Sequence, residues 1–138
     1  MFTLDKYGRT PIYEQLIEQV EGRILDGALG EQDALPSVRA LAVSLGVNPN
    51  TLQKAYAELE RRGVCASAPG SGRFVAEGAR ARIADARRAR LEELARVTRE
   101  LAIAAIPLAE LLRCVEDAYA LAAPGGAPTP TPGAAEKG

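Results

Sequence analysis

Two short amphipathic helices are predicted in the middle of the chain with only three residues, 46–48, between them, and this spacing restricts the fold more than any other feature. Apolar residues recur at helical spacing over 38–45 and again over 52–59. Gly46 ends the first segment, and Asn48 and Pro49 are a strong N-cap and a favoured first residue for the second. Two helices joined by a tight turn that contains Gly are typical of a helix-turn-helix.

A third amphipathic segment precedes this pair. Thr10-Pro11 is a good helix start, and the apolar residues that follow recur with a helical period. The pattern predicts a helix over about 11–26, which Gly27 ends.

A β-hairpin pattern follows the pair. Two short runs, 64–68 and 73–76, flank the turn sequence Pro69-Gly70-Ser71-Gly72. A hairpin directly after a helix-turn-helix is a wing. We therefore predict a winged helix-turn-helix domain over residues 1–78, with its second, recognition helix at about 49–62 and its wing at 64–76.

The rest of the chain has a different composition. Residues 79–105 are rich in Ala, Arg, Leu and Glu without Gly or Pro, which predicts one long helix, and Pro107 breaks it. A second helix is expected over about 108–122. The Pro- and Gly-rich tail, 124–138, is expected to be disordered. The fold class is thus mostly α with a small β-hairpin, a winged helix-turn-helix followed by a two-helix extension over 79–123.

The two C-terminal helices carry an apolar stripe that a lone helical pair would leave exposed. Two helices cannot enclose a pocket of roughly 300 Å³, but they can pack against a second copy of the chain. We predict a homodimer with two-fold symmetry. Its interface is expected to contain Leu101, Leu108, Leu111, Leu112, Val115 and Tyr119.

Composition argues against several other classes. The chain has no His, which removes the commonest general base and most zinc sites. We expect no enzyme activity, no cofactor and no metal. The start of the chain lacks the pattern of a signal peptide, and no apolar run is long enough to span a bilayer. With two unpaired cysteines, this predicts a cytoplasmic protein with reduced thiols and no membrane partner.

The charge is unevenly distributed along a chain whose net charge is −1. Residues 1–35 hold three Lys/Arg against seven Asp/Glu, whereas residues 36–76 hold five against two, and residues 79–99 hold seven against three. A surface that binds double-stranded DNA requires a local positive potential, but the chain as a whole does not have to be basic. Arginines on solvated helix surfaces give the same pattern, so charge alone decides nothing.

Polar residues gather at the start of the predicted recognition helix. That end of such a helix faces base edges in the major groove. Asn50, Thr51, Gln53 and Lys54 lie largely on the arc opposite the apolar residues. Asn and Gln can bond adenine, and Thr can reach a phosphate or a thymine methyl group. The plainer interpretation is that Asn48 only caps the helix and that the others are solvated surface.

The preceding helix and the wing supply further candidates. Ser37 and Arg39 lie at a helix start, where free N–H groups and partial positive charge suit a phosphate. An ion pair between Arg39 and an acid of the first helix is the alternative. Gly70 and Gly72 let the wing backbone approach DNA, and Arg73 at the wing base is a candidate for a backbone contact. An ordinary hairpin turn is the alternative here.

Several of these motifs together resemble the GntR family of bacterial regulators. The resemblance is carried by Pro11-Ile12-Tyr13-Glu14-Gln15-Leu16, by Leu35-Pro36-Ser37-Val38-Arg39-Ala40-Leu41-Ala42, by Gly46-Val47-Asn48-Pro49-Asn50-Thr51-Leu52 with Lys54-Ala55-Tyr56 and Glu58-Leu59-Glu60, and by Gly70-Ser71-Gly72-Arg73-Phe74-Val75. It spans about residues 11–76 in one order and spacing. The run 48–51 and the short C-terminal region resemble the YtrA-like subfamily.

The resemblance implies a repressor that binds DNA. For the predicted two-fold homodimer, the operator is then expected to be a pseudo-palindrome with half-sites one or more helical turns apart. By position, the contacts that the resemblance implies are Ser37, Arg39, Asn48, Asn50, Thr51, Gln53, Lys54, Gly70 and Gly72. Two departures stand out. Arg73 replaces the Thr that commonly precedes Phe-Val in the wing, and the C-terminal helices are unusually rich in Ala and Arg.

Three alternatives remain open at this point. The winged helix is a protein-interaction module that never touches DNA, or the chain is part of a longer enzyme in which such a domain is fused to an aminotransferase-like one, or a small effector binds at the dimer interface. The sequence identifies no effector.

Overall fold

The structure, a computed structural model, describes residues 2–122. The chain divides into two compact units whose boundary falls between Ala89 and Arg90. The tail predicted over 124–138 lies outside the described residues.

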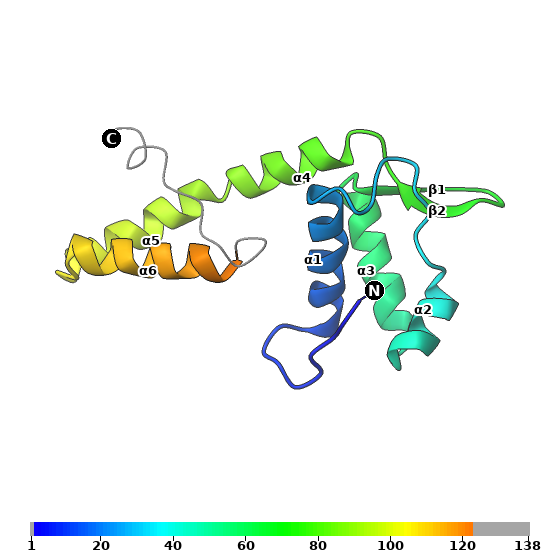
Figure 1. The fold of residues 1–138 in the computed structure, drawn as a ribbon, viewed down its shortest axis with the longest axis horizontal. Coiled ribbons are helices and arrows are strands. Elements are labelled where there is room, and N and C mark those ends of the chain that lie inside the picture. Colours follow the sequence, from blue (N-terminus) through cyan, green and yellow to red (C-terminus); the bar gives the residue numbers. More distant parts are fainter. Residues whose placement is uncertain (1, 123–138) are drawn as a thin grey trace. The chain divides into compact units, whose positions relative to one another are not determined.

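The first unit contains four helices and a two-stranded sheet, in the order α1, α2, α3, β1, β2, α4 (Figure 1). Helix α3 contacts both α1 and α2, and β1 follows it directly and packs on it. The elements are α1 (Ile12–Leu25), α2 (Val38–Leu45), α3 (Pro49–Arg61), β1 (Cys65–Ala68), β2 (Gly72–Val75) and α4 (Ala79–Arg88).

The helix-turn-helix forms as its local signals predict. The Ser37 hydroxyl oxygen accepts a hydrogen bond from the Ala40 amide at 3.1 Å, which caps α2. Gly46 ends that helix in the left-handed region at φ 68°, where a side chain would be strained. Asn48 then caps α3 through its Oδ1, 2.8 Å from the Asn50 amide. The predicted starts and ends of these helices are confirmed to within a residue or two.

The hairpin is antiparallel, with Cys65 opposite Val75 and Ala68 opposite Gly72. The loop before α2 adds to it, because the Leu35 amide donates to the Arg73 carbonyl and the Val75 amide donates to the Asp33 carbonyl, both at 2.9 Å. Backbone hydrogen bonds thus hold the wing beside the start of α2.

The core of this unit is mostly aliphatic, with Phe2 and Tyr56 as its buried aromatic residues. Its most buried large side chains come from α1, α3, β2 and the residues just after α3, and they are Leu16, Val20, Leu52, Tyr56, Leu59, Val64 and Val75. Helix α4 joins this core, because Ala79 and Ile83 are buried and α4 contacts α1. The first compact unit therefore includes residues beyond 78.

Residues 79–105 form two helices rather than the predicted single one. Helix α4 ends at Arg88, and α5 (Leu91–Ile103) begins three residues later. Ala89 and Arg90 keep right-handed helical angles, and neither is Gly or Pro. Local composition therefore carries no sign of the interruption. It coincides with the boundary at which packing against the core stops.

Glu21 is the buried charged residue of this core. Its carboxylate lies 3.0 Å from Arg62 Nη1, at the C-cap of α3, and 3.1 Å from Arg87 Nη2, in α4. A buried carboxylate requires such partners, because its desolvation is otherwise costly. Glu21 thus joins three helices through two ion pairs.

The second unit consists of α5 and α6 (Leu108–Ala122) within its described residues. Residues 104–107 connect them and reverse the chain direction (Figure 1). Ala105 has a left-handed φ of 67°, and the Ile106 amide donates to the Leu101 carbonyl at 3.0 Å, which closes the end of α5. The predicted break at Pro107 and the predicted helix over 108–122 are confirmed.

No residue of α5 or α6 is buried. Over residues 2–122, no helix combines the length and the apolar character needed to cross a membrane.

Candidate nucleic-acid interface

Helix α3 separates its buried and polar residues as the sequence predicts. Its apolar side chains face the core, whereas Asn50, Gln53 and Lys54 are exposed and Thr51 is half-buried. The polar residues lie within the first two turns, next to the cap at Asn48. The first half of α3 therefore presents amide, hydroxyl and ammonium groups to solvent.

The two cap residues keep hydrogen-bonding capacity. Ser37 and Asn48 each use a side-chain oxygen to accept a backbone amide. The hydroxyl proton of Ser37 and the amide protons of Asn48 remain available as donors to a ligand.

Lys54 and Arg39 differ in how they are held. The Lys54 ammonium lies 4.0 Å from the centre of the Tyr13 ring, a cation–π contact that joins α3 to the first turn of α1. Arg39 is exposed and makes no ion pair or hydrogen bond within residues 2–122. The ion pair with the first helix, considered from the sequence, is not formed, so this guanidinium is free for an external anion.

The wing tip is shaped by its backbone. Gly70 and Gly72 have φ values of 76° and 69°, and a Cβ added at either would meet nothing within 4 Å. Glycine is thus favoured at both positions because the backbone is left-handed, and not because a side chain would lack space. Both are exposed, which leaves the tip backbone accessible.

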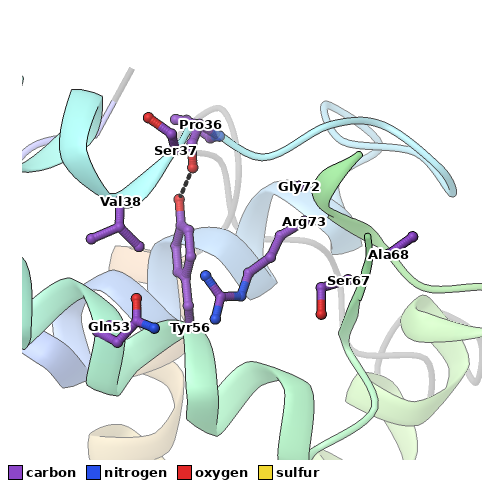
Figure 2. Close-up of a pocket in the computed structure, with 9 residues that line it drawn as sticks. All are labelled: Pro36, Ser37, Val38, Gln53, Tyr56, Ser67, Ala68, Gly72 and Arg73. Carbon is purple, nitrogen blue, oxygen red and sulfur yellow. Dashed lines mark hydrogen bonds between the residues drawn. The ribbon is translucent and has the colours of Figure 1, made fainter. Parts of the chain in front are cut away.

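Arg73 points toward α3 rather than out from the wing (Figure 2). Its Nε lies 3.4 Å from Glu60 Oε2, and its guanidinium carbon lies 5.3 Å from the centre of the Tyr56 ring. Arg73 therefore joins the second strand of the hairpin to the recognition helix.

The Arg73 guanidinium lies in a shallow hollow of about 350 Å³ between the start of α2, α3 and the hairpin (Figure 2). Ser37, Gln53 and Gly72, predicted as separate contacts, also line it. Arg39, Lys54 and Gly70 do not.

Tyr56 contributes a polar group that the sequence analysis missed. Helical spacing places Tyr56 among the apolar residues of α3, but its hydroxyl donates to the Pro36 carbonyl at 2.8 Å, and Tyr56 lines the same hollow. Burial raises the pKa of Tyr56 to about 12, so the hydroxyl stays protonated and acts as a donor. A tyrosine in an apolar stripe signals such a polar tip, because buried hydroxyls require partners.

A helix-turn-helix whose second helix is followed by a β-hairpin defines a winged helix-turn-helix protein, and here backbone hydrogen bonds also join the hairpin to the loop before α2. Its exposed polar groups are suited to the edges and phosphates of a nucleic acid.

Comparison with known proteins narrows this class. The profile of bacterial regulatory proteins of the gntR family matches residues 12–75. The chain is 40% identical over 93 residues to the HTH-type transcriptional repressor YtrA of Bacillus subtilis, covering 67% of this chain and 72% of that protein.

Two solved structures are similar over most of both chains. A GntR family transcriptional regulator from Listeria monocytogenes has a TM-score of 0.63 at 31% identity, covering 83% of this chain and 98% of that one. YtrA from Sulfolobus acidocaldarius, a GntR-family transcription factor, has a TM-score of 0.57 at 31% identity, covering 75% and 97%.

The chain belongs to the GntR family of bacterial regulatory proteins and is a DNA-binding transcription regulator with a winged helix-turn-helix. Its resemblance to the YtrA-like subfamily is confirmed by its similarity to the two YtrA proteins.

Proposed function

We propose that the chain is a cytoplasmic repressor that binds a pseudo-palindromic operator as a homodimer, without a catalytic step of its own. The observation that carries the DNA contact is the polar face of α3, where Asn50 and Gln53 are exposed and Gln53 lines the hollow between α2, α3 and the wing. Their amides read base edges, whereas the Arg39 guanidinium binds a phosphate.

The other contacts divide into two groups. Ser37, Asn48, Thr51 and Lys54 bind the DNA backbone around the recognition helix, and Gly70 and Gly72 bring the wing backbone close to it. Arg73 is directed at Tyr56 and Glu60, so its part is to hold the hairpin against α3. This replaces the direct backbone contact that we expected from its position in the sequence.

The proposal of a homodimer rests on the second unit. Its predicted interface residues Leu108, Leu112, Val115 and Tyr119 are between 47% and 66% exposed within one chain, and Leu101 is 37% exposed. Leu111 is half-buried. Covering them with the same face of a second chain removes this apolar area from water. Repression is proposed because the similar Bacillus subtilis protein is named a repressor.

Fluorescence anisotropy tests the proposal directly. The protein is titrated onto DNA from upstream of its own gene and onto random DNA, each at two salt concentrations. We expect tighter binding to the upstream DNA, with affinity that falls steeply as salt increases. No binding to either DNA by a folded protein would overturn the proposal in favour of a protein-interaction module.

Three variants assign the contacts in the same assay. Arg39→Ala should weaken binding to both DNAs by a similar factor, because a phosphate contact is independent of sequence. Asn50→Ala and Gln53→Ala should mainly reduce the ratio of the affinity for upstream DNA to the affinity for random DNA, by about 5- to 150-fold for a lost bidentate contact. The reverse pattern for any of the three would contradict its assigned role.

A further inference from the structure

A turn near the start of the chain, Asp5–Thr10, carries two cationic side chains and an exposed aromatic ring that the proposed function leaves unused. Lys6 and Arg9 are exposed, and Tyr7 is 98% exposed. The charge count over residues 1–35, three Lys/Arg against seven Asp/Glu, hides this local pair of cations.

The turn has a defined shape before any partner binds. The Gln15 side chain of α1 accepts from the Asp5 amide at 2.8 Å and donates to the carbonyls of Asp5 and Thr10 at 2.9 and 2.8 Å. Asp5 Oδ1 accepts from the Tyr7 amide at 3.1 Å. A Cβ at Gly8 would lie 2.7 Å from Asp5 Oδ2, so the Asp5 carboxylate lies close over the turn at this position. A preorganised segment loses less conformational entropy when it binds.

A long-range contact attaches the turn to the helix-turn-helix. Lys6 Nζ donates to the Gly46 carbonyl at 3.1 Å. Gly46 ends α2, two residues before Asn48, the cap of α3. The turn is therefore fixed at the end of α3 that presents Asn50 and Gln53 to solvent.

The chemistry of the turn fits an anionic backbone. Asp5 is its only carboxylate, and Oδ1 of that group already accepts the Tyr7 amide. Arg9 has no hydrogen bond or ion pair within residues 2–122. A guanidinium, an ammonium and a phenol are donors that bind phosphate oxygens.

We propose that the turn Asp5–Thr10 is a second DNA contact, in which Lys6, Arg9 and the Tyr7 hydroxyl bind backbone phosphates beside the bases that α3 faces. This rests on the proposed function and extends it. The turn adds affinity and fixes the protein on the duplex, whereas discrimination between sequences remains with α3.

A salt series with charge-matched variants tests the turn. We compare wild type, Arg9→Gln and the double variant Lys6→Gln/Arg9→Gln on operator and random DNA. The control is Arg80→Gln/Arg88→Gln, which removes the same charge from exposed positions of α4. We expect the plot of log affinity against log salt to become shallower by about 0.9 for Arg9→Gln and about 1.8 for the double variant, with the operator-to-random ratio unchanged. The control should keep the wild-type slope.

DNA in which single phosphates are made neutral identifies the phosphate that Arg9 binds. Methylphosphonates replace single phosphates in and beside the operator half-site. At the phosphate bound by Arg9, neutralisation should weaken the wild type several-fold and Arg9→Gln hardly at all. Because Arg9 has no partner within residues 2–122, its loss leaves the fold intact, which a thermal melt verifies.

Two results would overturn the turn contact while leaving the proposed function in place. In one, wild type binds the operator and Arg9→Gln matches it in affinity and salt slope. In the other, the α4 control loses as much affinity and salt dependence as the double variant, which would mean that only the net charge of the protein matters. Failure of wild type to bind any DNA would instead remove the proposed function itself.

Discussion

Glu58 is the residue whose ionisation the structure perturbs most clearly at the surface. Its carboxylate accepts hydrogen bonds from Arg61 at 2.6 and 2.9 Å and from Arg62 at 2.8 Å. These hydrogen bonds hold the pKa of Glu58 at about 2, well below its ordinary value of 4.5. Because Arg62 also binds Glu21, the ionised Glu58 supports the end of α3 at which three helices meet.

This lowered pKa predicts a pH-dependent contribution to stability. A carboxylate with a lower pKa in the folded state stabilises the fold fully above its unfolded pKa, and this contribution is lost as pH falls toward the folded value. Glu58→Gln should therefore lower the melting temperature by roughly 2–4 °C above pH 5, a small effect for an exposed pair, and the gap should close toward pH 2. Circular dichroism melts from pH 2.5 to 7 measure it.

A second carboxylate variant controls for net charge. Glu77 makes no ion pair in the described chain, so Glu77→Gln should show no such closing gap. A constant difference between wild type and Glu58→Gln at every pH would contradict the assigned pKa.

At the scale of elements, α4 depends on one carboxylate for part of its attachment. Arg87 reaches the buried Glu21 of α1 at 3.1 Å, whereas its neighbour Arg88 has no such partner. Arg87→Ala should destabilise the protein by about 1–3 kcal/mol in a urea titration, because a buried charge loses one of its two partners. Arg88→Ala should match the wild type, and an equal loss in both variants would assign the effect to helix propensity alone.

The elements that the sequence predicted are those with local signals. Gly46, Asn48 and Pro49 mark the ends of α2 and α3 within a few residues, and Pro107 marks the start of α6. The break between α4 and α5 after Arg88 has no Gly, Pro or capping residue to signal it, because it lies where packing on the first unit stops.

The site was predicted in part for the same reason. The polar face of α3 follows from helical spacing, but the inward direction of Arg73 depends on Tyr56 and Glu60, which lie on another element. The contact of Lys6 with Gly46 crosses 40 residues and leaves no trace in local sequence. Glu21 was detectable, because it lies within the apolar stripe formed by Ile17, Val20 and Ile24.

At the scale of the whole molecule, tight binding to an operator with two half-sites depends on the proposed dimer. Leu112 is 52% exposed within one chain, so Leu112→Asp should leave the fold of the monomer intact. A charge in the proposed interface should produce monomers in analytical ultracentrifugation. Operator affinity should then fall about 100-fold or more, because the second half-site is no longer bound as an intramolecular step.

A neighbouring surface change is the control for the dimer. Arg113→Ala alters an exposed residue next to Leu112 and should remain dimeric with wild-type affinity. A Leu112→Asp protein that still sediments as a dimer would reject the proposed interface.

The attachment of α4 to the first unit has a consequence for Ala89 and Arg90, the two residues between α4 and α5. Ala79, Ile83 and Arg87 fasten α4 to the winged unit, and the boundary with the second unit falls directly after this helix, between Ala89 and Arg90. In the proposed dimer, each winged unit is attached to the paired helices through these two residues. We therefore expect substitutions there to change which half-site spacing is bound most tightly, while the bases that α3 contacts stay the same.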